Sequence, residues 1–143
     1  MNVHQISVFL ENRAGQLSEI TAVLAENHID LRAISIAETV DYGVLRMIVD
    51  DAERATSILL SHGYILSMTP VTVIAVPDQV GGLAPVLSIL AEAHIDIEYM
   101  YSLFTHKEGQ AYMVFRMSDE ETFAKKLQEH GMHPATKAEL GLK

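Results

Sequence analysis

The second half of this chain repeats the first, and this duplication limits the possible folds more than any other feature of the sequence. At an offset of 66 positions, LAENHID at 24–30 matches LAEAHID at 90–96. Later in each half the offset is 70, where VLRM at 44–47 matches VFRM at 114–117. The change in offset marks a four-residue insertion around 105–110. Such a duplication predicts two copies of one structural unit.

Pro70 marks the expected boundary between the copies. Proline cannot donate a hydrogen bond within a sheet, and it favours extended geometry in the preceding residue. We therefore expect two domains, residues 1–69 and residues 70–143. A unit of this size buries only about 60% of its unfolded surface and is marginally stable alone. We expect the two units to pack together, and the chain to form a homodimer.

The hydrophobic pattern of each copy changes its period in a fixed order. Apolar and polar residues alternate over 4–11, which indicates a half-buried strand. Leu17, Ile20 and Leu24 instead share one face of a helix that is predicted over 15–27. The rest of the first copy is predicted as strands 31–40 and 44–50, which form a hairpin, then helix 52–61 and strand 65–69.

The second copy is expected to contain the same elements. Leu83, Leu87 and Leu90 repeat the helical spacing of the first copy. The sequence SDEE at 118–121 has the form of a capping box, which predicts the start of the second helix there. A strand over 135–139 is expected to close this copy.

The order strand, helix, strand, strand, helix, strand predicts the α+β class. It corresponds to two ferredoxin-like βαββαβ units in tandem, each an antiparallel sheet with its helices on one face. Right-handed crossovers place the first and third strands of a unit in the centre of its sheet. The second and fourth strands are then expected at the edges.

Two short segments resemble the signature of the ACT domain family. The loop ENRAGQL at 11–17 and its copy DQVGGL at 78–83 are similar to the family pattern Asn/Asp-x-Pro-Gly-x-Leu. Ala14 and Val80 stand where that pattern has proline. The resemblance spans nearly the whole chain twice, as in a free-standing tandem ACT protein. It implies a regulatory module that binds an amino acid.

Gly15 and Gly81 are the first candidate ligand-binding residues. A glycine at a strand-to-helix turn lets the backbone approach a ligand, and the free amides of the helix start attract an anion such as an α-carboxylate. Asn12 and Asp78 would help to fix the turn. The alternative is that each glycine serves only close packing of the helix on the sheet.

Asp30 and Asp96 are the second candidate pair. The resemblance implies that acidic or amide residues at these places, together with the loop residues, hold the polar groups of an amino acid at the junction of two domains. Each aspartate would pair with the ligand ammonium. The alternative is that each aspartate accepts hydrogen bonds within a tight helix-to-strand turn. Leu10 and Val76 precede the loops, so we expect a rather apolar site.

The remaining residues indicate neither a metal site nor an active site. Cysteine is absent, which excludes thiolate catalysis and Cys-ligated zinc. Four of the seven histidines repeat as pairs at predicted helix ends, where an imidazole can bond the last carbonyls. The pairs are His28 with His94 and His62 with His130. We expect no cofactor, no metal and no catalytic residue.

These observations together favour a regulatory or sensor protein over an enzyme. The first hypothesis is that it binds a small amino acid between ACT domains and modulates a metabolic enzyme or its own assembly. The alternative is a ligand-independent interaction protein or regulatory subunit of an amino-acid metabolic enzyme. An N-terminus without a basic flank or a long apolar run leads us to expect a cytoplasmic protein without a membrane partner.

The charge balance generates the first testable prediction. With 10 basic and 19 acidic residues, the formal charge is -9, which repels phosphate backbones. Retention on DNA or RNA in a filter-binding assay at physiological salt should therefore equal the background. Binding that weakens steeply as salt is raised would contradict this exclusion.

Overall fold

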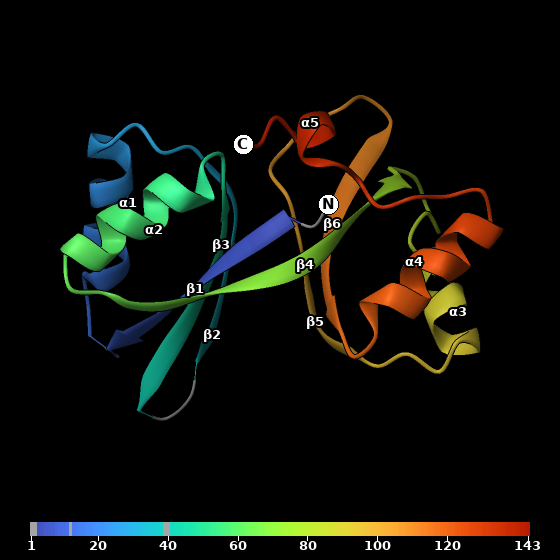
Figure 1. The fold of residues 1–143 in the computed structure, drawn as a ribbon, viewed down its shortest axis with the longest axis horizontal. Helices are drawn as coiled ribbons and strands as arrows, with labels where there is room; N and C mark the ends of the chain where they lie inside the picture. The colour runs from blue at the N-terminus through green and yellow to red at the C-terminus, as the bar shows by residue number, and fades with distance from the viewer. Residues whose placement is uncertain (1–2, 12, 39–40) are drawn as a thin grey trace. The chain divides into compact units, whose positions relative to one another are not determined.

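The computed structural model describes residues 3–11, 13–38 and 41–143 (Figure 1). The chain forms two compact units. The first unit comprises the described part of His4–Thr69 together with Gly141–Lys143. The second unit comprises Pro70–Leu140 together with Val3. None of the helices in the described residues is long and apolar enough to cross a membrane.

The first unit has the predicted order of elements. It contains β1 (Val3–Glu11), α1 (Gln16–Glu26), β2 (Leu31–Glu38), β3 (Tyr42–Val49), α2 (Ala52–Ser61) and the first part of β4 (Ile65–Pro77). The strand order is β2-β3-β1-β4, and β1 pairs with β3 in antiparallel register. The ferredoxin-like prediction is confirmed for this unit, with β2 at an edge as expected.

Both helices of the first unit lie on one face of its sheet because each carries an apolar stripe. Ile20 and Leu24 of α1 are buried, as is Leu59 of α2. They belong to one core with Val8 and Leu45, which are cross-strand partners on β1 and β3. The predicted period of the first helix is therefore confirmed.

The second unit repeats this arrangement except for its last strand. It contains the rest of β4, then α3 (Ala84–Glu92), β5 (Ile97–Ser102), β6 (Gln110–Met117), α4 (Glu120–Glu129) and α5 (Lys137–Leu140). Its strand order is β4-β6-β5, with antiparallel pairing. Leu90 of α3 and Phe123 of α4 are buried against Phe115 of β6 in one core. The ring centroids of Phe115 and Phe123 lie 6.2 Å apart.

The predicted strand over 135–139 is wrong. Ala135 donates its backbone N–H to the carbonyl of Val73 on β4 at 2.7 Å, but the chain then turns into α5. Thr136 Oγ1 accepts the backbone N–H of Glu139, which caps this helical turn. Leu140 is buried at its end. A local cap and one buried leucine therefore replace the strand.

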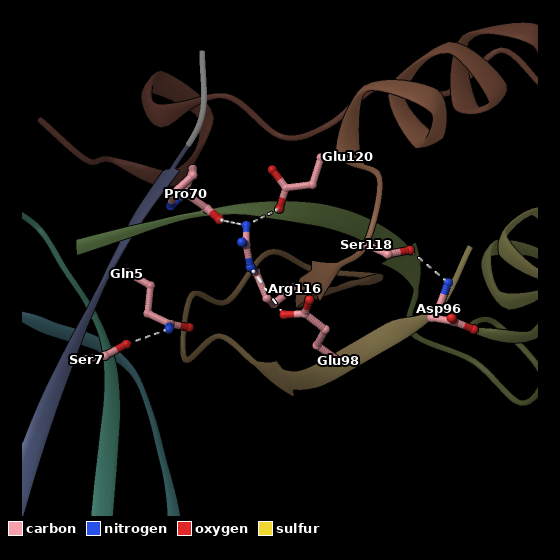
Figure 2. A network of polar contacts seen from close by, with 8 residues as sticks. All are labelled: Gln5, Ser7, Pro70, Asp96, Glu98, Arg116, Ser118 and Glu120. Atoms are coloured by element: carbon pink, nitrogen blue, oxygen red, sulfur yellow. Dashed lines mark hydrogen bonds and ion pairs between the residues drawn. The ribbon is translucent and has the colours of Figure 1, made fainter. Parts of the chain in front are cut away.

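Pro70 lies inside a strand. β4 continues through it from Ile65 to Pro77, so no loop separates the strand predicted over 65–69 from the first strand of the second unit. The missing N–H of Pro70 does not interrupt the strand. Its carbonyl accepts a hydrogen bond from Arg116 Nη1 at 3.2 Å (Figure 2).

The predicted capping box at 118–121 is wrong in detail. Asp119 is the cap of α4, and its carboxylate accepts the Thr122 backbone N–H at 3.0 Å and the Thr122 hydroxyl at 2.6 Å. These hydrogen bonds lower the pKa of Asp119. The Ser118 hydroxyl is used elsewhere, because it accepts the backbone N–H of Asp96 (Figure 2).

The packing of the helices generates the second prediction. Leu24→Ala and Leu90→Ala should each lower the free energy of unfolding by about 2–5 kcal/mol, because each removes a buried side chain and leaves a cavity. Urea unfolding followed by circular dichroism measures the loss. Leu60→Ala on α2 is the matched control, since Leu60 is 54% exposed and should cost less than about 0.5 kcal/mol. Equal losses at all three positions would contradict the assigned core.

Candidate functional site

Gly15 stands where the chain passes from β1 into α1. It is the N-cap of α1, and its φ of 88° lies in the left-handed region that favours glycine. Among the described residues, no side chain caps this helix start, and none has an atom within 4 Å of a Cβ built on Gly15. Without such a cap, the first amides of α1 can receive an anion. Asn12, the predicted partner in this loop, lies outside the described residues.

An ion pair crosses the helix start beside Gly15. Arg13 donates through Nη1 and Nη2 to the two carboxylate oxygens of Glu19, at 3.2 and 3.0 Å. Arg13 Nε also lies 3.5 Å from a carboxylate oxygen of Glu11. The hydrogen bonds and the charge of Arg13 lower the pKa of Glu19. Arg13 therefore lies between two carboxylates beside the helix start.

Two clefts of the first unit adjoin this loop. The smaller cleft, of about 120 Å³, lies between Arg13 and Ile36, and the larger, of about 250 Å³, lies between Tyr42 and Ile65. Gln16 lines both, and its Oε1 is a buried oxygen that has no hydrogen-bond partner among the described residues. A ligand donor in either cleft could satisfy this oxygen. The sequence offered no signal for Gln16, because its counterpart in the second copy is Gly82.

The corresponding loop of the second unit has a different shape. Gly81 also has a positive φ, of 79°, but α3 begins only at Ala84 and its N-cap is Leu83. Gly82 is buried, and a Cβ there would clash with the carbonyl oxygen of Pro77. The backbone N–H of Asp78 donates to the carbonyl oxygen of Gly109 at 2.9 Å. Gly81 therefore does not stand at a helix start as Gly15 does.

Asp30 and Asp96 occupy equivalent places where β2 and β5 begin. Asp30 donates its backbone N–H to the carboxylate of Asp50, and Asp96 donates to the hydroxyl of Ser118. The residue that follows β3 or β6 therefore supplies the acceptor in each turn. The carboxylate of Asp30 is 67% exposed and lies 3.9 Å from Arg32 Nε.

The predicted loop and aspartate sites do not meet within one unit. Gly15 precedes α1, and Asp30 follows it. A helix of 11 residues is about 16 Å long. One small amino acid cannot touch both ends of such a helix.

The four repeated histidines lie directly at or just after the helix ends, as expected. His62 Nδ1 and His130 Nδ1 each lie 2.9 Å from a carbonyl oxygen in the last turn of α2 and α4. His28 and His94 follow α1 and α3 with φ of 56° and 55°. The next amide in each case donates to a carbonyl five residues earlier, which is the Schellman arrangement. Within the described residues, no group of three or more potential ligands could hold a metal ion.

Arg116 forms ion pairs with two carboxylates of the second unit (Figure 2). Its Nε lies 3.5 Å from Glu98 on β5, and its Nη1 lies 3.7 Å from Glu120 at the start of α4. Burial raises the pKa of Glu120, although the charge of Arg116 opposes this effect. These contacts join two strands to a helix, which is a structural role.

A third cleft, in the second unit, was not predicted from the sequence. It has a volume of about 450 Å³. Its walls include Ala75 of β4, Lys107 and Gln110 around the start of β6, and His133 and Glu139 near α5. The four-residue insertion around 105–110 could have indicated this cleft, because it adds residues at this position in the second copy only.

The duplicated architecture is also found among known proteins. A family model described as an ACT domain pair matches residues 1–132. The chain is similar to a crystal structure of a protein from Bacteroides thetaiotaomicron, with 37% identity and a TM-score of 0.90 over 99% of this chain and 96% of that one. No curated protein matches the chain.

Two more distant structures share the fold. The regulatory subunit of aspartate kinase from Thermus thermophilus has 15% identity and a TM-score of 0.66, over 90% of this chain and 93% of that one. A structure of aspartokinase alpha and beta subunits has 19% identity and a TM-score of 0.56, over 90% and 91% of the two chains.

The ion pair at the loop generates the third prediction. Arg13→Ala should raise the pKa of Glu19 toward its ordinary value, and an NMR titration of the side-chain carboxyl measures it. Because the folded-state pKa of Glu19 is lowered, the pair stabilises the fold above the unfolded-state pKa and loses this effect as the pH falls through the folded-state pKa. An unchanged titration of Glu19 in the variant would show that the pair does not form in solution.

Proposed function

Because the chain belongs to the ACT domain family, we propose that it is a non-catalytic regulatory protein that binds a small amino acid. Binding would modulate a metabolic enzyme or the protein's own assembly. In this proposal, residues 1–69 and residues 70–143 are the two ACT domains, and the protein works in the cytoplasm as a homodimer. The fold that it shares with the regulatory subunit of aspartate kinase supports a role of this kind.

The observation that carries the proposal is the open helix start at Gly15. The amides of this helix start offer donors for a carboxylate, and Gln16 Oε1, which has no partner among the described residues, offers an acceptor for an amine. Such a combination suits a zwitterion better than a simple anion. The loop at Gly81 is the second proposed carboxylate site, with Asp78 beside it.

The exposed aspartates supply the second half of the proposed recognition. Asp30 or Asp96 would hold the ligand ammonium, while a helix start holds its carboxylate. Since Gly15 and Asp30 lie at opposite ends of α1, one ligand must take these groups from two different ACT domains. A ligand that bridges two domains favours one arrangement of them over another. Only such a difference in affinity between arrangements can carry a regulatory signal.

Exposed apolar side chains on the first unit support an alternative. Phe9 of β1 and Tyr42 of β3 are 46% and 44% exposed, and their ring centroids lie 5.9 Å apart. Ile65 of β4, which lines the same cleft, is 69% exposed. Exposed aromatic groups of this kind suit a protein interface. The alternative function is therefore a regulatory subunit that binds its partner without a small ligand.

The fourth prediction tests the proposal with a thermal-shift screen of the twenty amino acids. At about 100 times its dissociation constant, a ligand that binds only the folded state stabilises it by about 2.7 kcal/mol, which raises the melting temperature measurably. Asp30→Ala or Asp96→Ala should abolish this shift and lower the stability of the free protein by about 1 kcal/mol or less.

Glu121→Ala is the control, because Glu121 is an exposed carboxylate on α4 outside the proposed sites. It should leave the shift unchanged. If no amino acid at millimolar concentration moves the melting temperature, the interaction alternative replaces the sensor proposal.

A further inference from the structure

The larger of the two clefts beside the Gly15 loop has a volume of about 250 Å³. Its walls come from the end of β1, the residues around the start of β3, the turn that leads into β4 and the first residue of α1. All of these elements belong to the first compact unit. The volume is below the roughly 300–1,000 Å³ of a drug-sized site, so the cleft suits a small ligand.

Aromatic side chains from three parts of the chain line this cleft. Phe9 of β1 and Tyr42 of β3 have their ring centroids 5.9 Å apart. Tyr64, just before β4, is partly buried against the core. Aromatic faces are electron-rich and attract an organic cation that lies within about 6 Å of the ring centroid. Leu10 and Ile65 add apolar surface that suits the methylene groups of such a ligand.

The described charged side chains of this cleft are all acidic. They are the carboxylates of Glu11 and Asp41, and the described lining contains no lysine, arginine or histidine. Arg13 Nε lies 3.5 Å from one oxygen of Glu11, so this carboxylate is partly neutralised. Asp41 is exposed and forms no ion pair within the described part of the chain. The cleft therefore attracts a cation and repels a ligand carboxylate.

Gln16 brings a hydrogen-bond acceptor to the same cleft. It is the first residue of α1, and its buried Oε1 has no hydrogen-bond partner among the described residues. A buried polar atom without a partner costs free energy, which a ligand N–H group would recover. A ligand with only acceptor groups would leave this oxygen unsatisfied.

We infer that this cleft binds a small aliphatic amine that carries no carboxylate. Its ammonium group would lie beside Asp41 and the rings of Phe9 and Tyr42. Its alkyl chain would lie against the apolar wall. An α-amino acid does not suit this cleft, because its carboxylate would meet two acidic side chains. The inference therefore goes beyond the proposed function, whose ligand is a zwitterion, and the two sites share only Gln16.

The test is an NMR titration of the full-length, ¹⁵N-labelled protein with pH-matched butane-1,4-diamine. Physiological ionic strength screens general attraction to the net charge of -9. The backbone amide signals of Tyr42, Gly63 and Ile65 should shift and saturate, and butan-1-amine should shift the same signals. 4-Aminobutanoate, which adds a carboxylate, should bind about fivefold more weakly than butan-1-amine, or weaker still. Butan-1-ol, which has no charge, should not bind.

Two substitutions in the cleft should each weaken the binding of butane-1,4-diamine about threefold or more. Asp41→Asn removes a carboxylate, and Tyr42→Leu removes a ring but keeps an apolar side chain. The matched controls lie in the second unit and remove an exposed carboxylate, Glu121→Gln, or an exposed ring, Phe104→Leu. Neither control should change the affinity. Melting curves of all variants establish that they remain folded.

Three outcomes would overturn the inference. Equal binding of 4-aminobutanoate and butan-1-amine would show that the cleft does not reject a carboxylate. Equal losses of affinity in the cleft and control variants would show non-specific attraction to an acidic protein. The absence of any shift at Tyr42, Gly63 and Ile65 would reject the cleft as an amine site.

The proposed function is tested by different variants. Asp30→Ala and Asp96→Ala should abolish the stabilisation by an amino acid and leave the binding of butane-1,4-diamine unchanged. Asp41→Asn should do the reverse. The two proposals can therefore fail separately.

Discussion

The burial of two apolar helix faces on one face of each sheet determines where every candidate site lies. In the first unit, Leu24 of α1 and Leu59 of α2 join the core that Val8 and Leu45 provide from β1 and β3. This packing places α1 over the sheet, and the chain order puts its start after β1 and its end before β2. The open helix start at Gly15 and the exposed carboxylate of Asp30 therefore lie at opposite ends of this packed helix. The second unit builds an equivalent core around Phe115 and Phe123.

Duplication preserved the core and changed the loops. The helix ends are nearly identical, since His28 and His94 take the same left-handed conformation and donate to equivalent carbonyls. The helix starts differ, because Gly82 packs against Pro77 where the first unit has Gln16 facing two clefts. Core positions tolerate few changes because interiors are close-packed. Loops lack this constraint, so two copies of one unit can present different chemistry.

Charged side chains also differ between the two copies. Arg13 is held by Glu19 at one helix start, and its counterpart in the second copy is Gln79. The cleft beside β4 depends on an insertion and on a C-terminal segment that replaces a strand. Each of these differences lies outside the duplicated core.

Hydrophobic period and duplication were enough to predict the fold class, the helix over 52–61 and the burial of Leu24 and Leu90. These features depend on local spacing, which a sequence records directly. Tertiary structure alone decided that β4 runs through Pro70 and that Asp119 rather than Ser118 caps α4. It also decided that the last segment forms α5 after one hydrogen bond from Ala135 to β4. In each case several local conformations were available to the same residues, and the contact with a distant partner selected one.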